Sequence, residues 1–201
     1  MVLQESFYTR ADVVQIARDL LGKVLVTQVN GLYTAGMIVE TEAYAGIADL
    51  ASHAAHGRRT NRTEVMYSKG GVAYVYLCYG IHHLFNVVTN AADVPHAVLV
   101  RGIEPIDGID IMLLRRNKNR LTPALTAGPG SLSAALGITT NLTGAPLSGP
   151  EITIEDRGII TADADIVAGT RVGVGYAGED ALQPYRFSVR GNAYVSKGKE
   201  I

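Results

Sequence analysis

The sequence predicts an α+β fold with antiparallel strand pairing. Runs rich in Val, Ile, Tyr and Thr, most of them bounded by turn residues, indicate several strands. Two of these runs, residues 72–79 and 81–89, are separated only by Gly80, which leaves no room for the crossover helix that a parallel pair needs. The chain contains neither an internal repeat nor a convincing linker, so we expect a single domain over residues 1–201.

The first predicted element is a helix. Thr9 and Asp12 form a variant of the capping box, and apolar side chains recur at helical spacing from Val13 to Leu21. Gly22 then ends the helix, as glycine commonly does. The strand-like runs that follow are residues 23–29, 35–43, 72–79, 81–89 and 97–103.

The second half of the chain predicts shorter elements. Residues 105–116 are typical of a helix with proline near its start, and residues 131–136 indicate a second short helix. Three late strands are predicted at residues 151–154, 171–174 and 185–190.

The composition excludes several classes of protein. Apolar residues make up 47% and charged residues 18%, which is typical of a globular protein. The single cysteine, Cys78, excludes a disulfide framework within the chain and a multi-cysteine zinc site, and its place in an apolar strand predicts a buried, inert thiol. No apolar run approaches the roughly 20 residues of a transmembrane helix. Residues 1–9 do not resemble a signal peptide, so we expect a cytoplasmic protein without membrane contact.

The charge is unevenly distributed. A net charge of −1 does not favour a nucleic-acid binder, but residues 151–165 are strongly acidic and the remainder is basic. Two basic clusters could hold a polyanion, and solvated surface is the alternative for both. The clusters are Arg58, Arg59 and Arg62, and Arg115, Arg116, Lys118 and Arg120.

Acidic side chains alternate along the strand at residues 35–43. Residues two apart share one face of a strand, so Glu40, Glu42 and Tyr44 should lie on the same side. Neighbouring carboxylates push each other's pKa apart, which is one route to a general base. The alternative is an ordinary solvent-exposed face.

Tyrosines are concentrated in residues 74–79. Tyr74 and Tyr76 share a strand face, and Tyr79 stands beside the turn glycine. Aromatic walls with polar tips suit a flat heterocycle such as a nucleobase, although packing in the core is the common role of tyrosine.

The remaining motifs argue against metal and cofactor chemistry. His82 and His83 are adjacent and would point to opposite faces of a strand, and no metal-ligand motif is present. The pattern G-x-G-x-x-G at residues 173–178 lacks the helix and acidic residue of a dinucleotide site, and we interpret it as a glycine-rich strand edge. Residues 128–131 open a helix and could present backbone N–H groups to a phosphate, or simply form a turn.

These pieces together closely resemble one family, the alkyladenine (3-methyladenine) DNA glycosylases. The resemblance spans about residues 20–196. It is carried by Val39-Glu-Thr-Glu-Ala-Tyr44, His53, Thr60-Asn-Arg62, Met66, Tyr74-Val-Tyr-Leu-Cys-Tyr-Gly80, Asn86, Leu99-Val-Arg-Gly-Ile-Glu-Pro105, Arg171-Val-Gly-Val-Gly175 and Arg186-Phe-Ser-Val-Arg-Gly191.

The resemblance implies a role for each matching position. Glu42 would activate the attacking water, which Arg101 and the backbone carbonyl of Val172 would help to hold. Tyr44, His53 and Tyr76 would wall the pocket for the flipped base, Asn86 would lie at its floor, and Tyr79 would insert into the duplex. Each role is assigned because the residue at that position of this sequence matches the family's motif.

The resemblance also implies a compact bacterial enzyme built as one domain around a curved antiparallel sheet with flanking helices. We expect a monomer without metal or cofactor that removes damaged purines from double-stranded DNA. The substrates would be 3-methyladenine, 7-methylguanine and hypoxanthine. Glu40 is either a helper or a structural partner of an arginine, and no lysine lies in the run from Glu40 to Tyr44 to form a Schiff base.

The sequence departs from the family's pattern in two places, and two alternative functions remain open. Ser131 stands where the family usually has lysine, and His82 and His83 stand where aromatic residues or methionine are frequent. The alternatives are a hydrolase that acts on free nucleosides and a non-catalytic module that binds damaged DNA without releasing a base.

Overall fold

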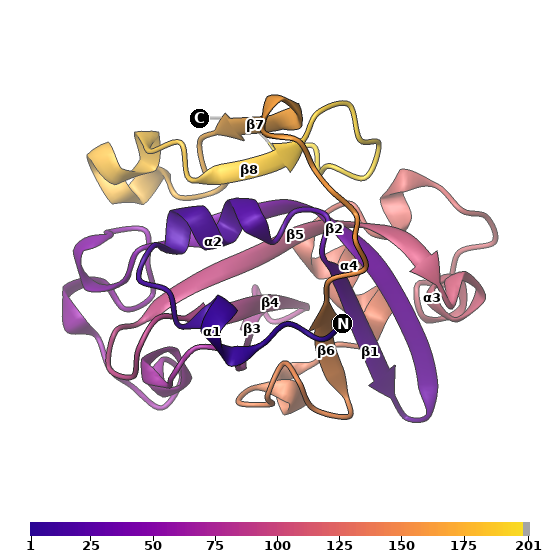
Figure 1. Ribbon diagram of the computed structural model, residues 1–201, viewed down its shortest axis with the longest axis horizontal. Helices are drawn as coiled ribbons and strands as arrows, with labels where there is room; N and C mark the ends of the chain where they lie inside the picture. Colours follow the sequence, from indigo (N-terminus) through magenta and orange to yellow (C-terminus); the bar gives the residue numbers. More distant parts are fainter. Residues whose placement is uncertain (199–201) are drawn as a thin grey trace.

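The computed structural model describes residues 1–198, which form a curled antiparallel sheet with flanking helices (Figure 1). All named strands belong to one eight-stranded sheet, in which the order β3-β4-β5-β2-β1-β6 is extended by β8 on β2 and β7 on β8. The strands are β1 Val24–Val29, β2 Leu32–Tyr44, β3 Ala73–Cys78, β4 His82–Thr89, β5 His96–Asp107, β6 Ile152–Glu155, β7 Ile166–Gly169 and β8 Arg186–Val189. The predicted α+β class and the antiparallel pairing of β3 with β4 are confirmed.

The helices are short and flank the sheet. The α-helices are α1 Glu5–Tyr8, α2 Val13–Asp19, α3 Ile109–Arg115 and α4 Pro129–Leu136. The 3₁₀ helices are η1 Gly46–Ala48, η2 Ala55–Gly57, η3 Glu64–Tyr67, η4 Pro123–Leu125, η5 Thr140–Leu142, η6 Asp163–Asp165 and η7 Gly175–Leu182. In the described part of the chain, no helix has the length and apolar character needed to cross a membrane.

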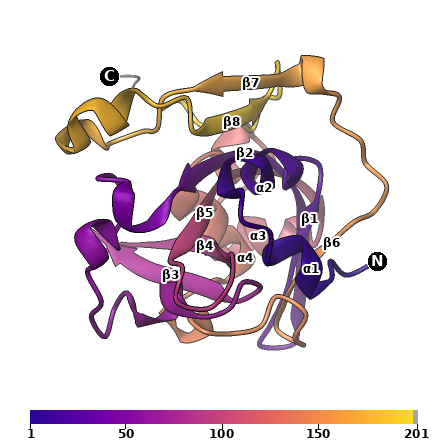
Figure 2. The same ribbon diagram turned by 60° about the vertical axis from the view of Figure 1, so that its left-hand side comes forward.

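The core lies where α2 and α4 cover the sheet. Ile16 of α2 and Leu132 of α4 are fully buried in the same apolar cluster as Ile38 of β2 and Val100 of β5. The hydroxyl of Thr41 donates to the carbonyl of Ala17 at 2.8 Å, which ties α2 to β2. β8 pairs antiparallel with β2 at Glu40 to Glu42, beyond the part of β2 that pairs with β1, and β7 pairs with β8 on its far side (Figure 2).

β2 and β5 form the longest strand pair, and their pairing is irregular. The register between them shifts near Ala35, and twice around Glu40. Shifts of this kind are typical of β-bulges, which bend a strand and redirect its side chains. The irregularity lies where β2 carries both of its glutamates.

Three predicted elements need correction. The predicted helix at 105–116 begins only at Ile109, because Pro105 is part of β5 and Gly108, with a φ of 69°, separates strand from helix. The predicted strand at 171–174 is wrong: the strand is β7, and a φ of 75° at Gly173 is incompatible with an extended run. The glycine-rich stretch after it is therefore irregular and leads into η7, not a strand edge.

The N-terminal helix starts differently from the prediction. The carboxylate of Asp12 accepts from the backbone N–H of Gln15 at 2.9 Å and caps α2. Thr9 takes no part in that cap, because it ends α1, a short helix that the sequence analysis did not predict.

Candidate active site

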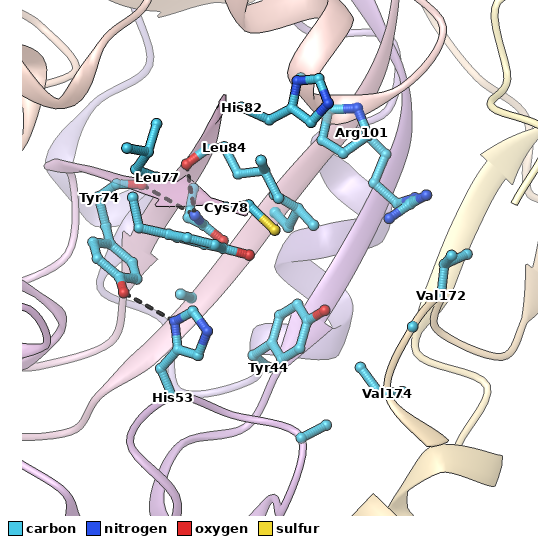
Figure 3. A pocket seen from close by; sticks show the side chains of 18 of the residues that line it. Tyr44, His53, Tyr74, Leu77, Cys78, His82, Leu84, Arg101, Val172 and Val174 are labelled. Atoms are coloured by element: carbon cyan, nitrogen blue, oxygen red, sulfur yellow. Dashed lines mark hydrogen bonds between the residues drawn. The ribbon is translucent and has the colours of Figure 1, made fainter. Parts of the chain in front are cut away.

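A cavity of about 710 Å³ opens beside the ends of β2, β3, β4 and β5 (Figure 3). Seven of the eight predicted site residues line it: Tyr44, His53, Tyr76, Tyr79, Asn86, Arg101 and Val172. They come from four strands, two loops and the β3–β4 turn, so the fold brings together positions that lie as far apart in the sequence as Tyr44 and Val172.

The eighth residue, Glu42, lies directly behind the cavity wall. Its carboxylate is fully buried and makes three contacts with residues that do line the cavity. The backbone N–H of Val172 donates to Oε1 at 2.7 Å, and the hydroxyl of Tyr44 donates to Oε2 at 2.9 Å. Nη1 of Arg101 lies 3.3 Å from Oε1. Glu42 is therefore the point on which the catalytic candidates converge.

The ionisation of Glu42 is balanced between opposing effects. Burial raises its pKa, because the charged carboxylate loses its hydration. Arg101, the N–H of Val172 and the hydroxyl of Tyr44 each lower it, while the nearby Glu40 raises it further. The net pKa is raised above the ordinary value, toward the range that suits a general base.

Glu40 is the ion-pair partner of Arg101. Nε of Arg101 donates to Oε1 of Glu40 at 3.0 Å, and both side chains are buried. The guanidinium thus bridges the two glutamates of β2. This geometry supports the structural alternative for Glu40 that the sequence left open.

Aromatic rings form the other wall of the cavity. The rings of His53 and Tyr76 meet edge to face with centroids 4.6 Å apart, and Tyr74 lies 5.5 Å from Tyr76. Nδ1 of His53 is 2.9 Å from the hydroxyl of Tyr74, and this hydrogen bond is one of the dashed lines in Figure 3. A flat apolar slot with polar edges results, which suits a planar heterocycle.

The protonation of His53 follows from its partners. Nη2 of Arg62 lies 3.2 Å from Nε2 of His53, and an arginine can only donate. Nε2 therefore accepts, and Nδ1 carries the proton toward Tyr74. Burial, followed by the charges of Arg62 and Arg58, lowers the pKa of His53 to about 4. The imidazole is neutral near pH 7.

Asn86 is buried at the cavity and fixed by the backbone. Its Nδ2 donates to the carbonyls of Tyr74 at 3.1 Å and Leu84 at 3.2 Å. These two bonds use both amide hydrogens. Any contact between this side chain and a ligand would therefore be made by Oδ1.

Tyr79 projects from the tip of the β3–β4 hairpin. It is 92% exposed and adopts a φ of 51°, and Gly80 follows with a φ of 73°. Two successive positive φ values are typical of a tight hairpin turn, which here carries the ring away from the core. The neighbouring Ile81 is also exposed, so the tip is apolar and has no partner within the described chain.

Sequence analysis missed a buried ion pair beside the site. Arg171 is fully buried, and its Nη2 donates to Oδ1 of Asp49 at 2.9 Å. Its guanidinium lies 4.9 Å from the centroid of the Tyr44 ring, and Val172 follows it in the chain. Arg171 therefore lies next to both residues that donate hydrogen bonds to Glu42, Tyr44 and Val172. Nothing in the sequence pairs it with Asp49, which is 122 residues away.

Several arginines of the two predicted basic clusters form ion pairs or hydrogen bonds within the protein. Arg59 pairs with Glu64 and Asp93, and Arg115 donates to the backbone carbonyls of Val29 and Ala135. Arg116 donates to the hydroxyl of Ser131 at 3.1 Å, beside the start of α4.

Cys78 and the glycine-containing turn at residues 128–130 also line the cavity. Cys78 is partly exposed and lines it, which corrects the prediction of a buried thiol. Gly128 and Gly130, in the turn that opens α4, line the same cavity. Among residues 1–198, no group of three or more His, Cys, Asp or Glu side chains is arranged to hold a metal ion.

Comparison with known proteins relates the whole chain to one group. The pattern of the methylpurine-DNA glycosylase family matches residues 6–193. A Chlamydia abortus protein is 47% identical over 187 residues, covering 92% of this chain and 97% of its own. A Chlamydia felis protein is 44% identical over the full length of both chains, and a Bacillus cereus protein is 46% identical over 96% of this chain and 97% of its own. All three are provisionally named as 3-methyladenine DNA glycosylases.

Proposed function

Because the chain belongs to the methylpurine-DNA glycosylase family, we propose that it flips alkylated and deaminated purines out of duplex DNA and releases them by hydrolysis. It is a DNA glycosylase of base excision repair, a hydrolase of N-glycosyl bonds. The proposed substrates are 3-methyladenine, 7-methylguanine and hypoxanthine, and the product is an abasic site.

The observation that carries the mechanism is the buried Glu42, which accepts hydrogen bonds from Val172 and Tyr44 and forms an ion pair with Arg101. The attacking water would bind where Arg101, Val172 and Tyr44 meet, in front of the carboxylate. Its oxygen bonds to C1′ of the deoxyribose while the N-glycosidic bond breaks and its electrons pass to the base. Glu42 takes the proton of the water. A carboxylate also stabilises the oxocarbenium-like transition state, which carries positive charge on the sugar.

The shape of the cavity supports recognition of an extruded base. A base stacked inside a duplex cannot reach a buried carboxylate, so the nucleotide has to rotate out of the helix. The slot between Tyr44, His53 and Tyr76 would receive it. The exposed ring of Tyr79 would fill the space left in the stack, as inserted apolar side chains do.

The leaving group needs different help in different substrates. An alkylated purine is already cationic and departs without protonation, whereas hypoxanthine is neutral and needs a hydrogen bond at its departing ring. Among the described residues that line the cavity there is no lysine. An amine nucleophile is therefore not at hand, and we propose hydrolysis by water without strand cleavage.

The test is to identify the products. The protein is incubated with a duplex that carries one 7-methylguanine or one hypoxanthine, and in parallel with the free nucleosides. We expect release of the free base from the duplex, an abasic site in an unbroken strand and no reaction with the nucleosides. Hydrolysis of the nucleosides alone would indicate a small-molecule enzyme. Tight binding of the lesion without release would indicate a binding module, and either result would overturn the proposal.

A further inference from the structure

The segment after β8, which carries Asn192, Tyr194 and Ser196, lies close to the catalytic candidates. β8 itself pairs with β2 at Glu40 and Glu42. At Gly102, the residue after Arg101, an added Cβ would come within 2.6 Å of the carbonyl oxygen of Tyr194. The segment therefore packs directly on the backbone of β5 next to Arg101, at a position where only glycine leaves room.

Ser196 in this segment joins both members of the Arg101–Glu40 pair. Its backbone N–H donates to Oε2 of Glu40 at 2.7 Å, and its hydroxyl lies 2.9 Å from Oε1. Nη2 of Arg101 lies 3.1 Å from the same hydroxyl oxygen. An arginine can only donate, so the hydroxyl accepts a hydrogen bond from Arg101 and donates one to Glu40.

As a consequence, each of the three nitrogens of the Arg101 guanidinium has a partner. Nε is held by Glu40, Nη2 by Ser196, and Nη1 is left to face Glu42 at 3.3 Å. A rotation of the guanidinium away from Glu42 would break both of the other contacts. The hydroxyl of Ser196 thus completes a support that neither β2 nor β5 supplies.

We infer that Ser196 is a positioning residue that holds Arg101 in line with Glu42. The inference rests on the proposed function, because it gives Ser196 a role in the same hydrolysis. Ser196 lies beyond residue 193, where the match to the family pattern ends, so that match assigns it nothing.

The role predicts a change in the pH dependence. The positive charge of Arg101 lowers the pKa of Glu42 and therefore keeps it ionised at lower pH. If the guanidinium moves away, the pKa of Glu42 rises and the acid limb of the rate profile moves to higher pH. The other charged or titratable groups that face this network are Glu40, Tyr44, Tyr76, Arg171, Tyr176 and, 3.8 Å from Glu40, Arg186.

The test compares three variants in single-turnover excision across pH. Ser196→Ala removes the hydroxyl and keeps the backbone N–H. Ser196→Thr keeps both. Asn192→Ala loosens the same segment without touching Arg101, because Asn192 bonds Glu104 at 2.7 Å. We expect Ser196→Ala to slow excision about 10-fold and to move its acid limb to higher pH, because a guanidinium released at Nη2 is no longer held facing Glu42, and misplacement of a group at the site lowers the rate. Ser196→Thr and Asn192→Ala should excise at rates close to the wild type, and melting curves check that all three variants are folded at the assay temperature.

Two results would overturn the inference while leaving the proposed function in place. One is a wild-type rate and acid limb in Ser196→Ala. The other is an equal loss in Ser196→Ala, Ser196→Thr and Asn192→Ala, which would mean that docking of the segment matters and the hydroxyl does not. Absence of base release by the wild-type protein would refute the proposed function itself, and the inference with it.

Discussion

The ionisation of Glu42 depends on its contacts, and one of them, the hydrogen bond from the hydroxyl of Tyr44, can be removed by a single substitution. Burial raises the pKa of Glu42, and the charge of Arg101 and the hydrogen bonds from Val172 and Tyr44 each lower it. Tyr44 contributes through its hydroxyl alone, which donates to Oε2. A base that works in the ionised form is active above its pKa, so each donor extends its activity toward lower pH.

Tyr44→Phe should therefore move the acid limb of excision to higher pH. The ring still walls the cavity, but the pKa of Glu42 rises when the hydroxyl is lost. Rates on the alkaline side of the limb should change little. The measurement is the single-turnover rate between pH 5 and 8, with Tyr33→Phe as a matched loss of a hydroxyl outside the site. An acid limb at the wild-type position would show that this bond does not set the ionisation of Glu42.

Asn86 is the residue we expect to govern rejection of guanine. Its amide hydrogens are held by the carbonyls of Tyr74 and Leu84, so its position at the cavity is fixed. The exocyclic 2-amino group of guanine, which adenine and hypoxanthine lack, would clash with a side chain placed against that edge.

Asn86→Ser and Asn86→Ala should raise excision of guanine-containing bases relative to hypoxanthine. The measurement is base release from matched duplexes that carry guanine, 7-methylguanine or hypoxanthine at one position. Unfolding curves of both variants check that the lost backbone bonds have not disturbed the fold. An unchanged ratio among the three bases in folded protein would leave Asn86 as a structural amide.

The alternation of Glu40, Glu42 and Tyr44 could be recognised from the sequence, because side chains two apart in a strand share a face. The structure joins the two glutamates through Arg101 and joins Glu42 to Tyr44. Arg171 could not be recognised in the same way. Its contact with Asp49 depends on tertiary folding over 122 residues, and a single arginine in a sequence carries no sign of its partner.

At the scale of elements, the β3–β4 hairpin separates the exposed Tyr79 from the buried Tyr74. Both tyrosines were predicted on one strand run, but the turn at residues 79–80 sends Tyr79 into solvent. Apart from β7, which was predicted at 171–174 and lies at Ile166–Gly169, the strands were predicted to within about four residues, since their apolar runs are bounded by turns. Pro105 misled the prediction of the next helix, because proline is common at helix starts and is also tolerated at an irregular strand position.

Tyr79→Ala should weaken capture of the flipped base more than the chemistry. Filling the gap in the stack offsets an unstacking cost of a few kcal/mol. Excision from a stable base pair should therefore fall more than excision from a mismatched or bulged site, where less unstacking is needed. Leu114→Ala, which removes another exposed apolar side chain, serves as the control. An equal loss on both substrates would remove Tyr79 from base flipping.

At the scale of the molecule, curling of the sheet brings β2, β5 and the segment after η6 around one cavity. The class of fold was predictable from strand spacing, but the cavity was not, because it is closed by loops whose contacts are not local. The ion pair between Arg171 and Asp49 joins two of those loops, the one between η1 and η2 and the one between β7 and η7. Asp49 also accepts from the backbone N–H groups of Ala45 and Ala51.

Asp49→Asn should destabilise the whole protein. It leaves the fully buried guanidinium of Arg171 without its counter-charge, and breaking a buried ion pair in this way typically costs about 3–5 kcal/mol. The free energy of unfolding in urea measures the effect. Asp163→Asn, which removes the exposed partner of Arg18, should cost at most about 1 kcal/mol. Similar small losses in both variants would show that Arg171 finds other partners.

The most direct test of the account is the single-turnover rate of Glu42→Gln on a duplex with one damaged purine, measured beside its affinity for the same duplex. The amide keeps the shape of the side chain and cannot take a proton from water. We predict a rate lower by about 10²–10⁴, with lesion binding close to the wild type and normal activity in the exposed control Glu151→Gln. Excision by Glu42→Gln at the wild-type rate would contradict the assignment of Glu42 as the base.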